Sequence, residues 1–476
     1  MNALDPSAVP VSPRTVPPAP ATGQLARAAL VPSLLRKAAG NAVVLAHLPA
    51  QRSIAYAPRT RIEALRDARI ARMVRYAADT VPFYRDTFRE RGLDPRSFVT
   101  ARDLARLPLI DKDEVRRDPE RFRSTSRSGR SATFFISSGS SGKPARIYHD
   151  RRSLLANIAW GERERRVIAS ILGRELRYRE ASVGYPEGTI RRVRAFYQEA
   201  TLLKRPARLD LSVLAPFAET VKQLNAFRPD VIAGFGNYLA AMSRAVARGE
   251  VKLVPPKLFV YSAEGLSREM RREIEDTLGA PVLSHYSAVE TFKLGFLCEA
   301  RTGFHVHEDL CDVRIVDGEG RELADGVPGQ IVISNLVNRG TVLLNYRLGD
   351  LGSFATGSCA CGRTLRSLAE VDGRVEDMLE VPDGRVLHPR AIWGVLKPRA
   401  EVLQYQLVQE QPHAFVLRLV TASDDDHQRV APVVAREIEA LLGAGTRVTI
   451  ERHVKLVAER SGKLRMVIGL QPARMS

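Results

Sequence analysis

A regular alternation of short apolar runs and amphipathic stretches in mid-chain most constrains the fold. The segments PDVIAGFG (229–236) and PKLFVYSAEG (256–265) are short and apolar and contain glycine at their ends, which is typical of buried strands. The next stretch, LSREMRREIEDTLG (266–279), predicts a helix with Ser267 as its N-cap and Gly279 just past its end. The face predicted to meet the core carries Leu266, Met270, Ile274 and Leu278. Strands alternating with helices predict an α/β fold with layered sheets.

A second pattern begins near Gly373. Residues 401–420 and 447–457 resemble strands, and residues 427–443 between them resemble a helix, so together they predict a compact strand–helix–strand unit. A chain of 476 residues is too long for one ordinary core. We therefore predict a large multi-sheet domain and a small, mobile α+β domain at the C-terminus, with the chain divided at residues 1–60, 61–374 and 375–476.

Composition indicates a globular protein. Hydrophobic residues make up 45% and charged residues 26%, and no apolar run approaches the roughly 20 residues that span a bilayer. Four cysteines in so long a chain provide no disulfide framework, so a cytoplasmic location is expected.

The formal net charge of +18 raises the question of nucleic-acid binding. The arginines are scattered, often alternate with glutamate, and come with no recognised nucleic-acid motif, so solvated helical faces are the better interpretation. Anionic ligands such as ATP, CoA or an acidic carrier protein would also suit this charge. The Pro-rich residues 1–23 are expected to be disordered, and the basic stretch 24–48 to form a short peripheral helix; a targeting or docking role is the alternative.

A Ser/Gly-rich loop lies between two short strand-like runs in TFFISSGSSGKPARIYHD (133–150). It is not a P-loop, because only Ser140 and Ser141 separate its two glycines and a proline follows the lysine. A dinucleotide fingerprint is also absent from the chain, since Gly234-Phe235-Gly236 lacks the third glycine. Small residues, hydroxyls and one lysine nevertheless suit polyphosphate, although a flexible connection has the same composition. The loop residues concerned are Ser137, Ser138, Gly139, Ser140, Ser141, Gly142 and Lys143.

Four further motifs follow this loop in a fixed order: HYSAVE (285–290), YRLGDLG (346–352), GRVEDML (373–379) and SGKLRMV (461–467). Together with the loop they resemble the motifs of the adenylate-forming superfamily, which includes acyl-CoA synthetases, nonribosomal adenylation domains and luciferases. The segments VPFYRDTFRERGLDP, LPLIDKDEVRRDPERF and CACGRT resemble the branch of phenylacetate–CoA ligases and their capsule-biosynthesis relatives. The resemblance covers roughly residues 61–467.

The resemblance implies a role for each motif in nucleotide binding. The Ser/Gly loop would hold the β- and γ-phosphates, Tyr286 would stack on adenine, and Glu290 would hold Mg²⁺, for which a carboxylate is a suitable ligand. Asp350 would accept hydrogen bonds from both ribose hydroxyls, assisted by Arg374. Ala263, Glu264 and Gly265 would line the adenine.

The resemblance also assigns residues to catalysis and to the acid. Lys463 would bridge the substrate carboxylate and the α-phosphate, and Glu376 would lie at the hinge, where the family usually has Asp or Lys. Ser287 and Val289 depart from the family's usual Gly and Thr, as does Ala145, followed by Arg146, after the loop's proline. The segments that would line the acid pocket contain Phe235, Gly236, Tyr238 and Ser262.

The cysteines predict a second site. Cys298, His305, Cys359 and Cys361 have residue types suited to a structural Cys₃His zinc site, although C-x-C is tighter than the usual C-x₂-C. Ordinary buried or surface thiols are the alternative. Cys311 lies in a strand-like segment and is expected to be in the core.

Taken together, these features imply an AMP-forming ligase that uses ATP and Mg²⁺. It would convert a carboxylic acid, aromatic by analogy with the branch, into an acyl-adenylate and pass the acyl group to the thiol of CoA or of a carrier-protein phosphopantetheine. Capture by an amine to give an amide is one alternative, and a non-catalytic nucleotide-binding homologue is another. No nucleic-acid partner and no membrane span are expected, and a homodimer stays open.

Overall fold

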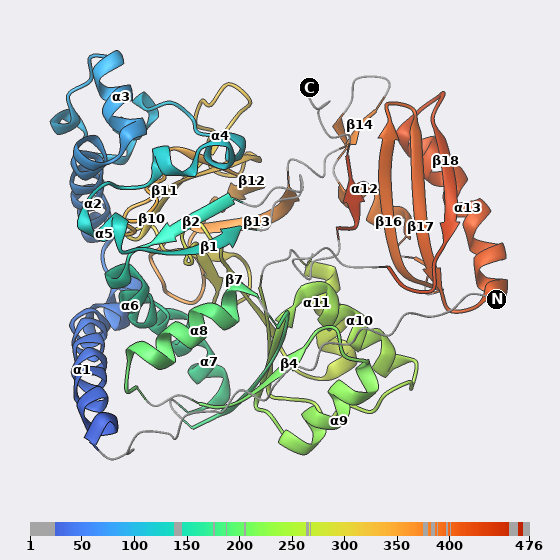
Figure 1. Cartoon of the computed structure of the whole chain (residues 1–476). Helices are drawn as coiled ribbons and strands as arrows, with labels where there is room; N and C mark the ends of the chain where they lie inside the picture. Colours follow the sequence, from blue (N-terminus) through green and yellow to red (C-terminus); the bar gives the residue numbers. More distant parts are fainter. Residues whose placement is uncertain are drawn as a thin grey trace, which may run out of the picture.

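The structure is a computed structural model of the 476-residue chain (Figure 1). It describes residues 24–137, 145–174, 177–186, 188–203, 206–262, 266, 268–374, 379–381, 386–387, 389–396, 398–399, 401–456 and 465–469. Within these ranges, positions 24–32, 269, 370, 372–374, 380, 386, 389–390 and 393 are described by their backbone alone.

An eleven-stranded mixed sheet organises the larger body, with strand order β10-β11-β12-β13-β9-β8-β7-β6-β5-β3-β4. One half is parallel: β3 (Arg179–Gly184), β4 (Ala207–Ser212), β5 (Val231–Phe235), β6 (Leu258–Ser262) and β7 (Val282–Tyr286). The other half is antiparallel: β8 (Gly295–Leu297), β9 (Phe304–Val306), β10 (Cys311–Val316), β11 (Gly329–Asn335), β12 (Tyr346–Phe354) and β13 (Ser367–Arg374). The parallel half confirms the α/β prediction.

Helices cover the parallel half on both sides: α7 (Glu162–Leu172), α8 (Thr189–Ala200), α9 (Phe217–Phe227), α10 (Gly236–Ala247) and α11 (Arg268–Leu278). The predicted core face is confirmed, since Met270, Ile274 and Leu278 of α11, and Leu266 just before it, are all at most 9% exposed. Gly279 adopts a φ of +67°, as expected for a residue that ends a helix. Ser267, the predicted N-cap, lies outside the described residues.

The strands β1 (Thr133–Ser137) and β2 (Ala145–His149) form a separate two-stranded antiparallel sheet. Thr133 pairs with His149, and Ser137 pairs with Ala145. The Ser/Gly segment therefore joins the two strands at the Ser137–Ala145 end of the hairpin. Along the chain, the hairpin is preceded by η2 (Pro95–Ser97), η3 (Ala101–Arg106), α4 (Lys112–Arg117), η4 (Pro119–Phe122) and α5 (Arg127–Arg130), and is followed by α6 (Arg151–Trp160).

The C-terminal part has its own sheet, of order β18-β17-β16-β19, seen at the right of Figure 1. The strands of this sheet are β16 (Val402–Gln411), β17 (Ala414–Thr421), β18 (Arg447–Arg452) and β19 (Val467–Ile468). The C-terminal part also contains a two-stranded sheet of β14 (Leu379–Glu380) and β15 (Val386–Leu387), and the helices α12 (Pro389–Leu396) and α13 (Asp424–Leu442). A core of its own includes the buried residues Leu407, Leu417 and Val434. Apolar residues recur at helical spacing in α13, and β17 is an almost continuous apolar run that is buried along most of its length, which explains this packing.

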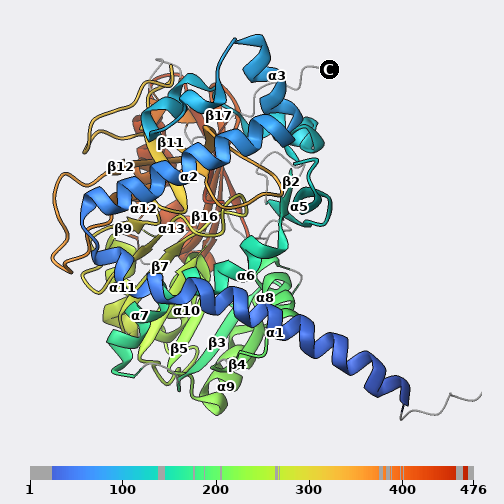
Figure 2. The same ribbon diagram turned by 90° about the vertical axis from the view of Figure 1, so that its left-hand side faces the viewer.

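The N-terminal helices are α1 (Gln24–Ser53), η1 (Ile54–Tyr56), α2 (Arg59–Thr80) and α3 (Pro82–Glu90). The expectation of a short helix was wrong, because α1 spans 30 residues and packs along α6, α7 and α8 (Figure 2). Gly40 explains this close approach: a Cβ there would lie 2.0 Å from the carbonyl oxygen of Ala200. Ile54 and Ala55 belong to the same hydrophobic core as α2. Among the described helices, none is long and apolar enough to cross a membrane.

Candidate nucleotide and acid site

The carboxyl ends of the parallel strands bring several predicted residues to one edge of the large sheet. Phe235, at the end of β5, pairs with Ser262 at the end of β6, and Ser262 pairs with His285 in β7. Tyr286 is the last residue of β7. In open α/β sheets, ligands bind outside the carboxyl ends of the strands, so this edge is the natural place for a site.

Tyr286 and Asp350 meet although they are 64 positions apart in the chain. The Tyr286 hydroxyl donates to Asp350 Oδ2 at 2.7 Å, because a carboxylate oxygen can only accept. In the β12–β13 register, Asp350 lies opposite Arg374. The structure thus brings together the residues predicted for adenine and ribose.

Glu290 lies in the turn that follows β7 and is 5% exposed. Its Oε1 accepts a hydrogen bond from the Tyr346 hydroxyl at 3.2 Å. Its backbone carbonyl accepts another from Asn335 Nδ2 at 2.9 Å. Both partners come from the antiparallel half of the sheet, so Glu290 is held where the two halves meet.

The phosphate loop can be assessed only at its first residue. Ser137 ends β1 and is 4% exposed, and its Oγ has no hydrogen-bond partner among the described residues. A buried hydroxyl without a partner costs free energy, so an oxygen-rich ligand beside it would fit this position. Ser138, Gly139, Ser140, Ser141, Gly142 and Lys143 lie outside the described residues.

The residues predicted for the acid pocket lie at the ends of β5 and β6 and in the first turn of α10. Gly236 begins α10 directly after Phe235, and a Cβ there would lie 2.8 Å from Leu266 Cγ, so this position needs glycine for close packing. Tyr238 packs instead against Phe217 of α9, with ring centroids 5.1 Å apart. Burial raises the pKa of the Tyr238 hydroxyl. Tyr238 thus contacts the helical layer beside the sheet.

The remaining predicted residues are beyond structural description. Ala263, Glu264, Gly265, the hinge residue Glu376 and Lys463 lie outside the described residues, and Arg374 is described by its backbone alone.

The predicted Cys/His cluster does assemble. The ligand atoms of Cys298, His305, Cys359 and Cys361 all lie within 4.8 Å of one another. Cys298 Sγ lies 3.6 Å from Cys359 Sγ, and Cys361 Sγ lies 3.2 Å from His305 Nε2. Ligands about 2.0 to 2.3 Å from a tetrahedral zinc are roughly 3.3 to 3.8 Å apart, so the donor set fits this ion. Cys311 is 1% exposed and lies in the core, as predicted.

A backbone contact orients the histidine of this cluster. His305 Nδ1 lies 3.3 Å from the carbonyl oxygen of Leu365, which can only accept, so Nδ1 carries the proton. This tautomer leaves the Nε2 lone pair directed at Cys361, as a metal ligand requires. Beside the cluster, Arg363 and Glu299 form an ion pair at 2.5 Å.

Sequence reasoning missed a buried charged network behind β7. Glu164 of α7 pairs with Lys293 and lies 3.4 Å from His307 Nε2, and all three side chains are at most 16% exposed. Burial alone would raise the pKa of Glu164, but Lys293 and the nearby His285 and His307 hold it well below its usual range. The alternation of His305 and His307 in the apolar segment FHVHEDL was the available signal.

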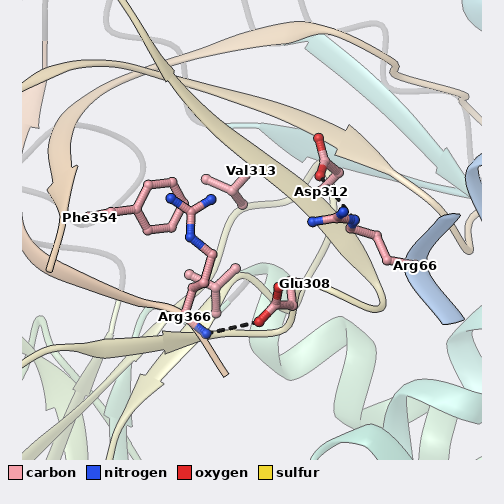
Figure 3. A pocket seen from close by; sticks show the side chains of 7 residues that line it. Arg66, Glu308, Asp312, Val313, Phe354 and Arg366 are labelled. Carbon is pink, nitrogen blue, oxygen red and sulfur yellow. Dashed lines mark hydrogen bonds and ion pairs between the residues drawn. The ribbon is translucent and has the colours of Figure 1, made fainter. Parts of the chain in front are cut away.

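Two cavities lie away from this edge. A small one of about 10 Å³, room for one water, is lined by Arg66, Asp312, Glu308 and Arg366 among others (Figure 3). A larger cleft of about 670 Å³ lies between α1, α5 and α6. Neither contains a residue predicted to bind nucleotide.

Comparisons with known proteins agree with this arrangement. No family model matches the chain. The phenylacetate–coenzyme A ligase of Thermus thermophilus is 27% identical over 450 residues, which cover 87% of this chain and 98% of the relative. That of Escherichia coli is 25% identical, covering 82% of this chain and 90% of the relative.

Solved structures show the same fold. The 2-hydroxyisobutyryl-CoA ligase in its postadenylation state matches with a TM-score of 0.71 at 20% identity, over 88% of this chain and 92% of that one. Sequence similarity to the curated ligases extends over nearly their whole length, and the order of the motifs agrees with it. The chain is therefore similar to the phenylacetate–coenzyme A ligases over nearly its whole length, in agreement with the resemblance of its motifs to the adenylate-forming superfamily.

Proposed function

We propose that this protein is an AMP-forming ligase that joins a carboxylic acid to CoA. The observation that carries the proposal is the meeting of Tyr286, Asp350 and Glu290 at the carboxyl edge of the sheet. The near full-length similarity to phenylacetate–coenzyme A ligases supports it and favours an aromatic acid.

The first reaction forms an acyl-adenylate. A carboxylate oxygen of the acid attacks the α-phosphorus of ATP, and pyrophosphate leaves. Tyr286 and Asp350 bind the nucleoside, and the buried Ser137 hydroxyl donates to phosphate. Glu290 would hold Mg²⁺, which neutralises charge on the phosphate oxygens when bound. The loop 138–143 and Lys463 complete this assignment by resemblance to the family.

The second reaction transfers the acyl group. The CoA sulfur attacks the acyl carbonyl carbon, AMP leaves with the bonding electrons, and the thiol proton passes to solvent. We propose that the C-terminal body rotates about Glu376 between the two reactions, with the boundary after Arg374, because the second core begins at Leu379. A carrier-protein thiol is the alternative acceptor. ATP, CoA and reduced cysteines favour a cytoplasmic location.

A structural zinc ion is the third element of the proposal. The Cys₃His donor set closes the loop before β13 against β8 and β9. With four protein ligands no open position is left, so the ion would stabilise the fold rather than react.

The test of the function is acid-dependent exchange of labelled pyrophosphate into ATP, over a panel of aromatic and aliphatic acids. Exchange with at least one acid, followed by CoA thioester formation with the same acid, is expected. A protein that binds ATP but exchanges with none of the acids would instead be a nucleotide-binding homologue without catalysis.

A further inference from the structure

His149 connects the β1–β2 hairpin to the turn that carries Glu290. It is the last residue of β2 and is 2% exposed. Its Nε2 lies 2.7 Å from the carbonyl oxygen of Val289, so Nε2 must carry the proton and donate. The bonded carbonyl belongs to the peptide group that joins Val289 to Glu290. The hydrogen bond therefore fixes the peptide plane from which the Glu290 side chain starts.

Three aromatic rings pack together around the hydrogen bond between His149 and Val289. The His149 ring lies 4.2 Å from that of Phe292 at an interplanar angle of 31°, and 5.8 Å from that of Phe135 in β1. Phe135 and Phe292 are themselves 5.3 Å apart, edge to face. Each strand of the hairpin thus packs a ring against Phe292 of the turn: Phe135 from β1 and His149 from β2.

The turn is held in a strained conformation. Phe292 has a φ of +61°, which a residue with a bulky side chain rarely adopts. Its amide donates to the Ala288 carbonyl at 2.7 Å, closing the turn around Glu290. Such strain persists only when the surroundings enforce it, and strained residues cluster at functional sites.

Two independent substructures must therefore be aligned. The hairpin is a separate two-stranded sheet, whereas Glu290 follows β7 of the large sheet. Asn335 and Tyr346 hold Glu290 from the side of the large sheet, and His149 holds it from the side of the hairpin. A site that binds a metal–nucleotide complex tolerates misplacement of only about 0.5 Å.

We propose that His149 is a positioning residue that sets Glu290 relative to the β1–β2 hairpin and thereby tunes the use of Mg²⁺ with ATP. The inference rests on the proposed function, because it assigns Glu290 to the metal and the loop to the triphosphate. Burial lowers the pKa of His149 to about 4, so the ring stays neutral and keeps one N–H at physiological pH.

The test compares three variants at neighbouring positions. His149→Phe keeps a ring and removes the donor, leaving a buried carbonyl unpaired. His149→Gln restores an N–H donor at a similar reach. Tyr148→Phe is the matched control, since it removes the 2.7 Å bond to Glu120 from the same strand without contacting the turn. Binding of ATP is measured by calorimetry across a Mg²⁺ titration, and pyrophosphate exchange across the same titration.

For His149→Phe we expect the half-saturating Mg²⁺ concentration to rise about tenfold, the size of one lost hydrogen bond to a buried group. The KM for the acid should be unchanged, His149→Gln should recover most of the loss, and Tyr148→Phe should match the wild type. Wild-type Mg²⁺ dependence in His149→Phe would overturn the proposal, as would equal losses in His149→Phe and Tyr148→Phe.

The two proposals can fail separately. If the wild type binds ATP with Mg²⁺ but shows no exchange, the proposed function is rejected and the binding titration still decides the role of His149. If the wild type binds no ATP at any Mg²⁺ concentration, both are rejected.

Discussion

Two buried aspartates three positions apart should respond in opposite ways to the same substitution. Asp312 in β10 is 3% exposed, and its Oδ2 has no hydrogen-bond partner among the described residues. Arg66 is 3.9 Å from Oδ1 (Figure 3). Arg66 is itself bonded to Asp67. Burial raises the pKa of Asp312 to about 6, and the neighbouring arginines offset this only in part.

The magnitude follows from linkage. The pKa of Asp312 is 3.8 in the unfolded chain and about 6 in the folded chain. This difference of about 2 pKa units corresponds to about 3 kcal/mol of folding free energy. Because the folded pKa is the higher one, the penalty is absent below about pH 4, grows between pH 4 and 6, and is complete above pH 6. Asp312→Asn removes the charge at nearly constant volume. It should raise the free energy of unfolding at pH 7.5 by about 1 to 3 kcal/mol and change it little at pH 4.

Asp309 is the control for this prediction. Its two oxygens accept hydrogen bonds from Arg163 at 2.7 and 2.9 Å, and Arg69 is also bonded to it. Burial alone would raise the pKa of Asp309, but Arg163 and Arg69 hold it well below its usual range. Asp309→Asn leaves buried Arg163 without its counter-charge and should cost about 3 to 5 kcal/mol at pH 7.5.

The assay is urea unfolding followed by tryptophan fluorescence at pH 4 and pH 7.5. The chain has two tryptophans, so a Trp393→Phe background leaves buried Trp160 of the larger body as the reporter. An Asp312→Asn variant that is no more stable than its parent at pH 7.5, while Asp309→Asn is destabilised, would refute the assignment of an uncompensated charge to Asp312.

Three further predictions concern the site. Tyr286→Phe removes the hydrogen bond to Asp350 and should raise the KM for ATP about threefold to tenfold in the exchange assay, and an unchanged KM would contradict a shared nucleoside site. Lys463→Ala should abolish adenylate formation but spare thioester formation from supplied acyl-adenylate, and loss of both would count against its role in adenylation alone. The purified protein should contain one zinc per chain by elemental analysis, and Cys361→Ser should lose it and lower the Tm; wild type without zinc would remove the metal proposal.

Local patterns predicted part of the structure well. The core face of α11 and its end at Gly279 follow from spacing within a single helix, and both were confirmed. Residue types alone also brought Cys298 and His305 into the predicted cluster. The packing of α1 was not predictable, because it includes a close approach between Gly40 and Ala200, which are 160 positions apart in the chain.

Buried polar contacts were the main omission. The bond between His149 and Val289 spans 140 positions, and that between Glu164 and Lys293 spans 129. A histidine at a strand end or a glutamate in a helix looks the same in sequence whether it is solvated or paired in the core. Only the three-dimensional arrangement separates the two cases.

Contacts between the start of the large body and its last strands have a consequence for synthesis. Arg59 at the start of α2 binds Glu308 at 2.5 Å and the carbonyl of Thr364 at 3.1 Å, and the Thr364 amide binds the Ala55 carbonyl. Thr364 lies 305 positions after Arg59, and a segment of this length takes about 15 to 60 s to translate at ordinary rates. During that time the apolar face of α2 has been synthesised but cannot yet pack against the last strands of the large body. The C-terminal hairpin of β16 and β17, whose residues pair within one short segment, can close within microseconds of emerging.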